Sequence, residues 1–194
     1  MQNLLISILK PKLAELPFVS LFGGLAHTLR TTSTSGAPQR MPISKEATIL
    51  QDRSLGPEQY VSLVPDGAER GVAYFEHRSL KVQGVASGRA NMTSVLRYVF
   101  WGNLGFGDSA AALAQLAVIK RIPDAKYNAG ALVGIFHQVT GIFMPQDGLF
   151  DKYTYNEAEL QYLMSPYTAF GIEITTAFSL PLAACVATTD PTDA

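Results

Sequence analysis

The sequence predicts an α+β protein with one mainly antiparallel sheet, a packed α-helix, an N-terminal helix and a long extended arm. The clearest strand pattern lies between Ile172 and Leu180, where apolar residues alternate with polar ones as they do when one sheet face is buried. An alanine-rich run over residues 109–122 has the composition of a helix. The other strand candidates are joined by short turns, which favours antiparallel neighbours. A length of 194 residues fits a single domain.

The N-terminal residues 4–16 carry apolar side chains at helical spacing, which predicts an amphipathic helix. Pro11 either kinks this helix or opens a second short turn, and Pro17 ends it in both cases. We expect a short strand over residues 18–22, closed by the Gly23-Gly24 pair.

Residues 30–55 are rich in Thr, Ser, Gly and Pro and show neither a helical nor a strand period. A connection of this length without structure is uncommon inside a compact domain. We therefore expect either a floppy surface loop or an arm that becomes ordered within an assembly.

A series of strand candidates follows, separated by glycine-containing turns. They cover residues 60–64, 72–77, 80–85 and 92–101. In the last of these, both faces are apolar except around Arg97, which indicates a central strand.

The helix predicted over residues 109–122 has Asp108 as its N-cap and Lys120 and Arg121 in its last turn, and it stops before Pro123. Its first three turns carry no charge. We therefore expect it to be buried between layers or against a neighbouring subunit.

The C-terminal third begins with a long strand over residues 131–143. A short helix within residues 157–163 must end before Pro166, because proline disfavours helical geometry in the residue before it. The strand over residues 172–180 should lie in the core, and the final residues TTDPTDA should be disordered.

The composition limits the possible functions. The net charge is −1, with 15 basic and 16 acidic residues, so bulk charge does not favour nucleic acid or an anionic membrane. We expect no signal peptide, because the apolar run over residues 4–9 lacks a cationic leader and a cleavage site, and we expect no membrane helix. Cys185 is the only cysteine, which fits a reducing compartment or an assembly built inside a cell. Only 16% of residues are charged, so we expect self-association to cover weakly polar surface.

No residue pattern indicates catalysis, a metal or a cofactor. His27, His77 and His137 have no Cys, Asp or Glu at ligand spacing, and we interpret His137 as a partly buried, hydrogen-bonded side chain. Cys185 lies in an apolar run without a nearby base and is interpreted as an inert hydrophobic residue. The glycines of residues 102–107 lack the spacing and the Lys-Ser/Thr ending of a phosphate-binding loop. We therefore expect a protein that is not an enzyme.

Tyrosines are numerous near the C-terminal strand, at Tyr153, Tyr155, Tyr162 and Tyr167. Tyrosine with neighbouring methionine is typical both of contact surfaces and of the wet edges of a core. The sequence leaves these two interpretations open.

Two segments resemble small neck and tail-completion proteins of phages and related contractile injection systems. The first reads RYVFWGNL over residues 97–104, and the second reads KYTY over 152–155, followed by LMSPY over 163–167 and FGI over 170–172. The order of elements is also similar to that of tail terminators, in which each subunit of a ring, usually a hexamer, combines an N-terminal helix, an antiparallel sheet with a packed helix, and a closing strand. The insertion over residues 30–55 departs from the compact form of that family.

The resemblance implies a virion or phage-like particle assembled in the host cytoplasm, where this chain forms a ring that terminates the tail tube or connects it to the next component. Its partners would be tail tube, sheath or connector proteins, with no specific nucleic acid and no membrane. We expect contacts at Arg30, Arg40 and Lys45 on the arm, and at Tyr153, Tyr155, Tyr162 and Tyr167 near the C-terminal strand.

Two other classes stay open. A capsid or decoration protein shares the composition argument and differs only in where it attaches. An enzyme or small-ligand-binding domain would use the turn over residues 102–107 together with His137, and would require polar groups to converge on one pocket.

Overall fold

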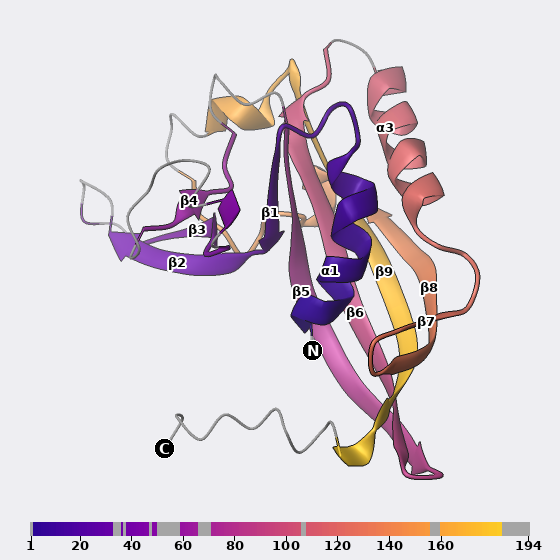
Figure 1. Cartoon of the computed structure of the whole chain (residues 1–194). Coiled ribbons are helices and arrows are strands. Elements are labelled where there is room, and N and C mark those ends of the chain that lie inside the picture. The colour runs from indigo at the N-terminus through magenta and orange to yellow at the C-terminus, as the bar shows by residue number, and fades with distance from the viewer. Residues whose placement is uncertain are drawn as a thin grey trace.

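The fold is built around a six-stranded sheet with the strand order β1-β5-β6-β9-β8-β7, as the computed structural model shows (Figure 1). Its strands are β1 (Leu21–Leu25), β5 (Gly71–Ala86), β6 (Arg89–Asn103), β7 (Tyr127–Ala129), β8 (Leu132–Phe143) and β9 (Tyr167–Pro181). The second sheet contains β2 (His27–Thr32), β3 (Pro38–Ser44) and β4 (Val61–Ser62). The structure describes residues 2–32, 36, 38–46, 48–49, 59–65, 71–105, 108–155 and 160–183.

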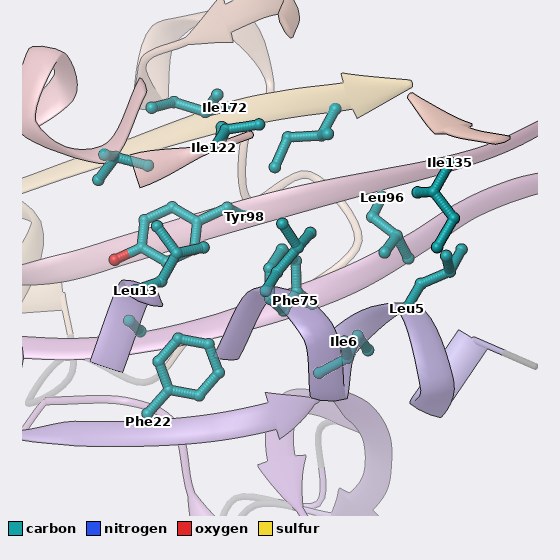
Figure 2. Close-up of a cluster of buried hydrophobic side chains, with 14 of the residues drawn as sticks. Leu5, Ile6, Leu13, Phe22, Phe75, Leu96, Tyr98, Ile122, Ile135 and Ile172 are labelled. Carbon is teal, nitrogen blue, oxygen red and sulfur yellow. The ribbon is translucent and has the colours of Figure 1, made fainter. Parts of the chain in front are cut away.

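Helices α1 (Gln2–Ala14) and α3 (Asp108–Arg121) pack on the same face of the large sheet, which we call the helix-covered face (Figure 1). Leu13 of α1 belongs to one buried cluster with Phe75, Tyr98 and Ile172 of the strands (Figure 2). Val118 of α3 belongs to the same cluster. The broad α+β class predicted from the sequence is therefore confirmed. Neither described helix is long and apolar enough to cross a membrane.

The large sheet is mixed, because β1 runs parallel to β5 while the other neighbouring strands of this sheet run antiparallel. β5 and β6 are joined by the tight turn Ser87-Gly88, whose φ values of 51° and 72° are those of a type I′ hairpin turn. β6 lies between β5 and β9, so the predicted central strand is confirmed. The predicted burial of alternate residues in β9 is also confirmed, for Ile172, Ile174, Thr176, Phe178 and Leu180.

The other face of the large sheet, which we call the opposite face, carries a second buried cluster. Tyr74 of β5 and Trp101 of β6 pack there against Leu149 and Phe150, which follow the short 3-10 helix η1 (Pro145–Asp147). The indole nitrogen of Trp101 donates a hydrogen bond of 2.6 Å to the carbonyl oxygen of Tyr162, in the 3-10 helix η2 (Gln161–Leu163). The connection between β8 and β9 is thereby fixed against the sheet.

The structure differs from the sequence prediction in the N-terminal region. Helix α1 continues through Pro11 to Ala14, so the alternative in which Pro11 opens a second short turn is wrong. The first strand begins at Leu21 rather than at residue 18, and it includes Gly23 and Gly24. Gly24 has φ +63°, a left-handed conformation that glycine adopts without strain, so this pair forms a bulge rather than an end.

The predicted structureless arm over residues 30–55 contains two strands in its described part. β2 and β3 form an antiparallel hairpin, and β3 also pairs with β4. The outer residues of this hairpin are polar on both faces, so no strand period marks them in the sequence. Residues 33–35, 37, 47 and 50–55 of the predicted arm lie outside the described residues.

Two further predictions are corrected, one by β-bulges and one by exposure. The separate strands predicted over residues 72–77 and 80–85 are one strand, β5, with register shifts between His77 and Ser79 and between Val82 and Gly84. The strand predicted over residues 131–143 is present as β8, with a bulge at Gly134, whose φ is +64°. Helix α3 is not buried between layers of the subunit, since two of its leucines are exposed. These are Leu113 at 67% and Leu116 at 52%.

Of the helix predicted within residues 157–163, only residues 160–163 are described, and they end in η2. The N-cap side chain of Asp108 also lies outside the described residues, as do residues 184–194, which include the end TTDPTDA that was predicted to be disordered.

Candidate interaction surface

The exposed hairpin of β2 and β3 places two arginines directly opposite each other. Arg30 and Arg40 are cross-strand partners in the register of the hairpin, and both are exposed. Like charges directly opposite each other in a sheet are destabilising. The hairpin therefore presents a concentrated positive charge that does not help the isolated subunit to fold.

The base of this hairpin is anchored to the core. Ile43 is 1% exposed and Ser44 is 0% exposed, so β3 passes from a protruding tip into the interior. The backbone N–H of Thr154 donates a 2.8 Å hydrogen bond to the carbonyl oxygen of Arg40. The structure thus brings the arm next to the tyrosine-rich segment, although more than a hundred residues separate them in the sequence.

The four tyrosines that were predicted as contact residues lie at the edge of the core and are buried to different extents. Tyr153 is 8% exposed and its hydroxyl is used inside the protein, so it is not available as a contact residue. Tyr155 is partly buried, with its ring 5.2 Å from that of Trp101 in an edge-on arrangement. Tyr162 and Tyr167 pack edge to face at 4.9 Å, and both remain partly exposed. Tyr155, Tyr162 and Tyr167 therefore keep partly exposed surface that a partner could contact.

Lys45 follows β3 directly and lines a cavity of about 280 Å³ between α1 and the start of the hairpin. Lys10 of α1 and Glu46 form an ion pair in the lining of this cavity, and His27 also lines it. Among the described residues, no group of three or more His, Cys, Asp and Glu side chains could hold a metal ion.

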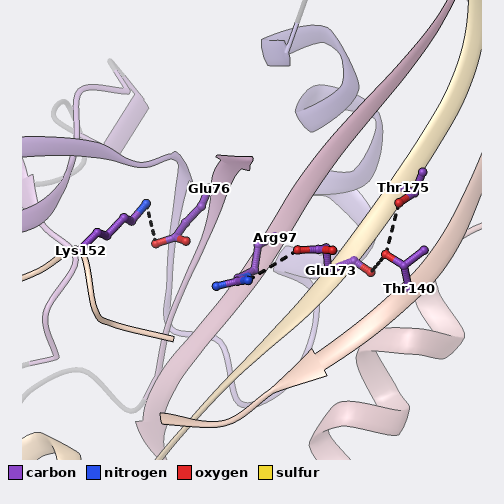
Figure 3. A network of polar contacts seen from close by, with 6 residues as sticks. All are labelled: Glu76, Arg97, Thr140, Lys152, Glu173 and Thr175. Atoms are coloured by element: carbon purple, nitrogen blue, oxygen red, sulfur yellow. Dashed lines mark hydrogen bonds and ion pairs between the residues drawn. The ribbon is translucent and has the colours of Figure 1, made fainter. Parts of the chain in front are cut away.

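A network of charged side chains lies on the opposite face of the sheet, and two of its members, Glu76 and Arg97, are buried (Figure 3). Glu76, Arg97 and Glu173 are register neighbours on β5, β6 and β9. Glu76 is 1% exposed and accepts hydrogen bonds from Lys152 at 2.9 Å and from the hydroxyl of Tyr153 at 2.8 Å. Lys152 and Tyr153 belong to the segment that binds β3, so the network joins the interaction surface to the sheet.

Arg97 is the other centre of this network. It is 4% exposed, its guanidinium group lies 3.5 Å from the carboxylate of Glu173, and it stacks over the ring of Phe143 at 4.1 Å. Gly171 leaves room for it, because a Cβ there would lie 3.1 Å from the Cδ of Arg97 and 2.6 Å from a methyl of Leu149. In the sequence, Arg97 stands out only as a charge in an apolar strand, and the network was not predicted.

Burial raises the pKa of the Tyr153 hydroxyl above its usual range, and the negative charge of Glu76 raises it further. The pKa of Tyr74 is also raised, first by burial and then by Tyr153, Tyr155 and Glu76. The phenol of Tyr153 consequently stays protonated at neutral pH and remains a hydrogen-bond donor to Glu76.

His137 lies on the helix-covered face, where it hydrogen-bonds to the Tyr127 hydroxyl through one ring nitrogen and to Thr176 through the other, at 2.8 Å. It is 3% exposed, so the interpretation of His137 as a buried, hydrogen-bonded residue is confirmed. Gly102 pairs with Thr168 and His137 with Thr176, so the two lie eight β9 residues apart, or about 26 Å at 3.3 Å per residue. The structure therefore does not bring His137 and residues 102–105 of the predicted turn to one pocket, and residues 106 and 107 lie outside the described residues.

Burial, with a smaller contribution from the charge of Lys12, lowers the pKa of His137 from 6.5 to about 4. The unfolded chain then binds a proton at a higher pH than the folded chain does. The stabilisation by neutral His137 is complete above pH 6.5 and is lost as the pH falls toward 4, by at most about 3 kcal/mol.

We expect this loss in urea unfolding measured from pH 7 to pH 4, and we expect His137→Gln to weaken the pH dependence. His27→Gln is the matched control, since His27 is exposed, and it should leave the pH dependence unchanged. Equal pH dependence in the wild type and His137→Gln would contradict the assignment.

A comparison with models of known protein families finds no match, and a comparison with curated proteins finds none either.

Proposed function

We propose that this chain is a structural subunit of a phage or phage-like tail or neck, which forms a ring that terminates the tail tube or connects it to the next component. The observation that carries the proposal is the pairing of Arg30 with Arg40 on an exposed hairpin that is anchored to the segment around Thr154. A partner with carboxylates at its surface would relieve the repulsion and accept bidentate hydrogen bonds from both guanidinium groups. The hairpin is thus better suited to a partner than to the isolated subunit.

The finer architecture supports the same proposal. An N-terminal helix, a mainly antiparallel sheet with a packed helix, and a closing strand follow the order that the resemblance to tail terminators implies. The exposed Leu113 and Leu116 of α3 add apolar surface away from the hairpin. A ring places two different surfaces of one subunit against each other repeatedly around an axis, so separate contact surfaces are what such a subunit needs.

In this proposal the partners are further copies of the chain, in a hexamer or another closed ring, and tail tube, sheath or connector proteins. The chain acts in the particle assembled in the host cytoplasm and contributes contacts rather than catalysis. A capsid or decoration protein would use the same hairpin, and addition of the capsid protein instead of the tail-tube protein distinguishes the two.

The mass of the purified protein, measured by light scattering over a range of concentrations, tests the proposal. We expect a discrete multimer, or a monomer that forms rings when the tail-tube protein from the same gene cluster is added. A strict monomer that ignores both the tail-tube and the capsid protein would contradict a structural role.

The double substitution Arg30→Glu/Arg40→Glu tests the hairpin itself. Two glutamates keep a like-charge pair across the strands, so the folding cost is matched while the sign of the charge offered to the partner is reversed. We expect at least a tenfold weaker assembly, equivalent to about 1.4 kcal/mol, at an unchanged melting temperature. Lys120→Glu/Lys126→Glu, at exposed positions, is the charge-matched control.

Arg30→Glu alone should separate folding from assembly. It creates an opposite-charge pair with Arg40, which should stabilise the free subunit by about 0.2–1 kcal/mol while still weakening assembly. Assembly that rises together with stability would contradict the proposed role of the hairpin. Deletion of residues 36–44 is a poorer test, because Ile43 and Ser44 are buried and their removal would disturb folding.

A further inference from the structure

On the helix-covered face, apolar side chains in the C-terminal half of β5 are exposed at the edge of the hydrophobic core. Two cross-strand rows show this, each running from β5 through β6 to β9. In the first row, Met92 and Phe178 are 7% and 3% exposed, whereas Val82 is 61% exposed. In the second row, Ala90 and Leu180 are 3% and 4% exposed, whereas Val85 is 60% exposed.

Leu80, at 36% exposure, continues the same side of β5, and we call Leu80, Val82 and Val85 the β5 strip. β1 covers the edge of β5 only as far as Phe75, where the backbone of Ala26 makes the last hydrogen bond described between them. The two bulges of β5 interrupt a regular ladder, which disfavours addition of a long strand along this edge. A short apolar segment that covers the side chains is therefore a better occupant than a complete strand.

The chain itself carries such a segment, which begins next to the strip. β9 ends at Pro181, opposite Arg89, and the N–H of Leu182 donates a 3.0 Å hydrogen bond to the carbonyl oxygen of Gly88, at the tip of the β5–β6 hairpin. The described residues end at Ala183. The sequence continues Ala-Cys-Val-Ala over residues 184–187, without a charge, before the polar end TTDPTDA.

The distance to be crossed is short. Leu180, Ala90 and Val85 lie on adjacent strands, so two steps of about 4.8 Å, or about 10 Å in total, separate Leu180 from Val85. Extended residues span about 3.3 Å each, and three of them are sufficient. Residues 184–187 can therefore reach the β5 strip within the same chain.

We propose that residues 184–187 pack on the β5 strip of their own chain, with Cys185 and Val186 covering Val82 and Val85. This contact would cover the exposed edge of the core on the helix-covered face. It would remove apolar surface of the β5 strip and of residues 184–187 from water. It is independent of the proposed ring, because it needs only one copy of the chain.

The native Cys185 provides the test. Val82→Cys and Val85→Cys are made separately, and Lys81→Cys is the control, since Lys81 lies on the same strand but its partner Thr93 is on the opposite face of the sheet. Each variant is oxidised at low protein concentration, and the products are separated on a non-reducing gel and identified by mass spectrometry. We expect an intramolecular disulfide from position 82 or 85 to Cys185 to form at least tenfold faster than from position 81.

Three results would overturn the proposal. Equal rates at positions 81, 82 and 85 would mean that the segment does not rest on the strip. Disulfides to Cys185 found only between two chains, and lost on dilution, would mean that the strip takes the tail of another copy. In a Cys185→Ser background, efficient joining of two chains through position 82 would mean that the strip of a second copy covers it.

A measurement without a disulfide gives a second check. Removal of residues 184–194 from Val85→Cys, in the Cys185→Ser background, should raise the rate of maleimide labelling at position 85 several-fold and leave the rate at position 81 unchanged. No change at position 85 would overturn the proposal independently of the oxidation experiment.

Discussion

Lys152→Met should lower the free energy of unfolding by about 3 to 4 kcal/mol, because it leaves the buried carboxylate of Glu76 without its cation. Glu76 is 1% exposed, whereas the Lys152 side chain is 37% exposed, so the cost comes from the carboxylate. The hydroxyl of Tyr153 still donates to Glu76, but one hydrogen bond does not replace a paired charge. Urea denaturation at pH 7 measures the effect.

The double variant Lys152→Met/Glu76→Gln is expected to recover most of this loss. The glutamine amide oxygen can accept the hydrogen bond from Tyr153, and no buried charge remains at position 76. Lys126→Met, at an exposed position, serves as the surface control and should cost less than about 0.5 kcal/mol. If Lys152→Met costs no more than this control, Glu76 does not depend on Lys152.

Elements with a strong local pattern could be predicted from the sequence. The strand over residues 172–180 alternates without interruption, and the helix over 109–122 combines good helix formers with a proline stop, so β9 and α3 follow closely. The β2–β3 hairpin could not be predicted in this way, because its outer residues are exposed on both faces and its pairing with β4 and Thr154 is distant in sequence.

β-Bulges explain the differences between the predicted and the observed strands β5 and β8. A bulge adds a residue to one strand and shifts the alternation, so the two register shifts made β5 look like two strands. In β8, the bulge at Gly134 allows Leu132 and Ile135 to be buried together although they are three residues apart. The strand itself was predicted, but a period of two does not give its buried face correctly.

Several residues of the interaction surface could be predicted from the sequence, but their positions relative to one another could not. Arg30 and Arg40 were expected as contact residues because they lie on an arm, yet only the hairpin register places them opposite each other. Tyr153 was expected at the surface, and its burial follows from Glu76, which is a distant residue in the sequence. Charges in apolar strands, such as Arg97 and Glu173, were the available signal for the buried network.

Arg97→Met should be about as damaging as any single change in this network, with an expected loss of about 4 kcal/mol in the free energy of unfolding. The substitution removes the cation next to Glu173 and the stacking on Phe143, while the methionine side chain has a similar length. Glu173→Gln is the matched comparison. Glu173→Gln leaves the buried guanidinium of Arg97 with its stacking on Phe143 and with Glu76 as its cross-strand neighbour, and the glutamine amide oxygen can still accept a hydrogen bond from Arg97. This change should therefore cost less than Arg97→Met, about 1 to 2 kcal/mol.

The two cations are expected to act together, because both lie next to Glu76. Arg97 is its cross-strand neighbour on the same face, and Lys152 is its direct ion-pair partner. Loss of either cation leaves the other to compensate partly, whereas loss of both leaves two carboxylates, Glu76 and Glu173, on one buried face. Arg97→Met/Lys152→Met should therefore be more destabilised than the sum of the single variants, by about 1 kcal/mol or more. Strict additivity in the double-mutant cycle would show instead that Lys152–Glu76 and Arg97–Glu173 are two independent pairs, and that the interaction surface is held by the first pair alone.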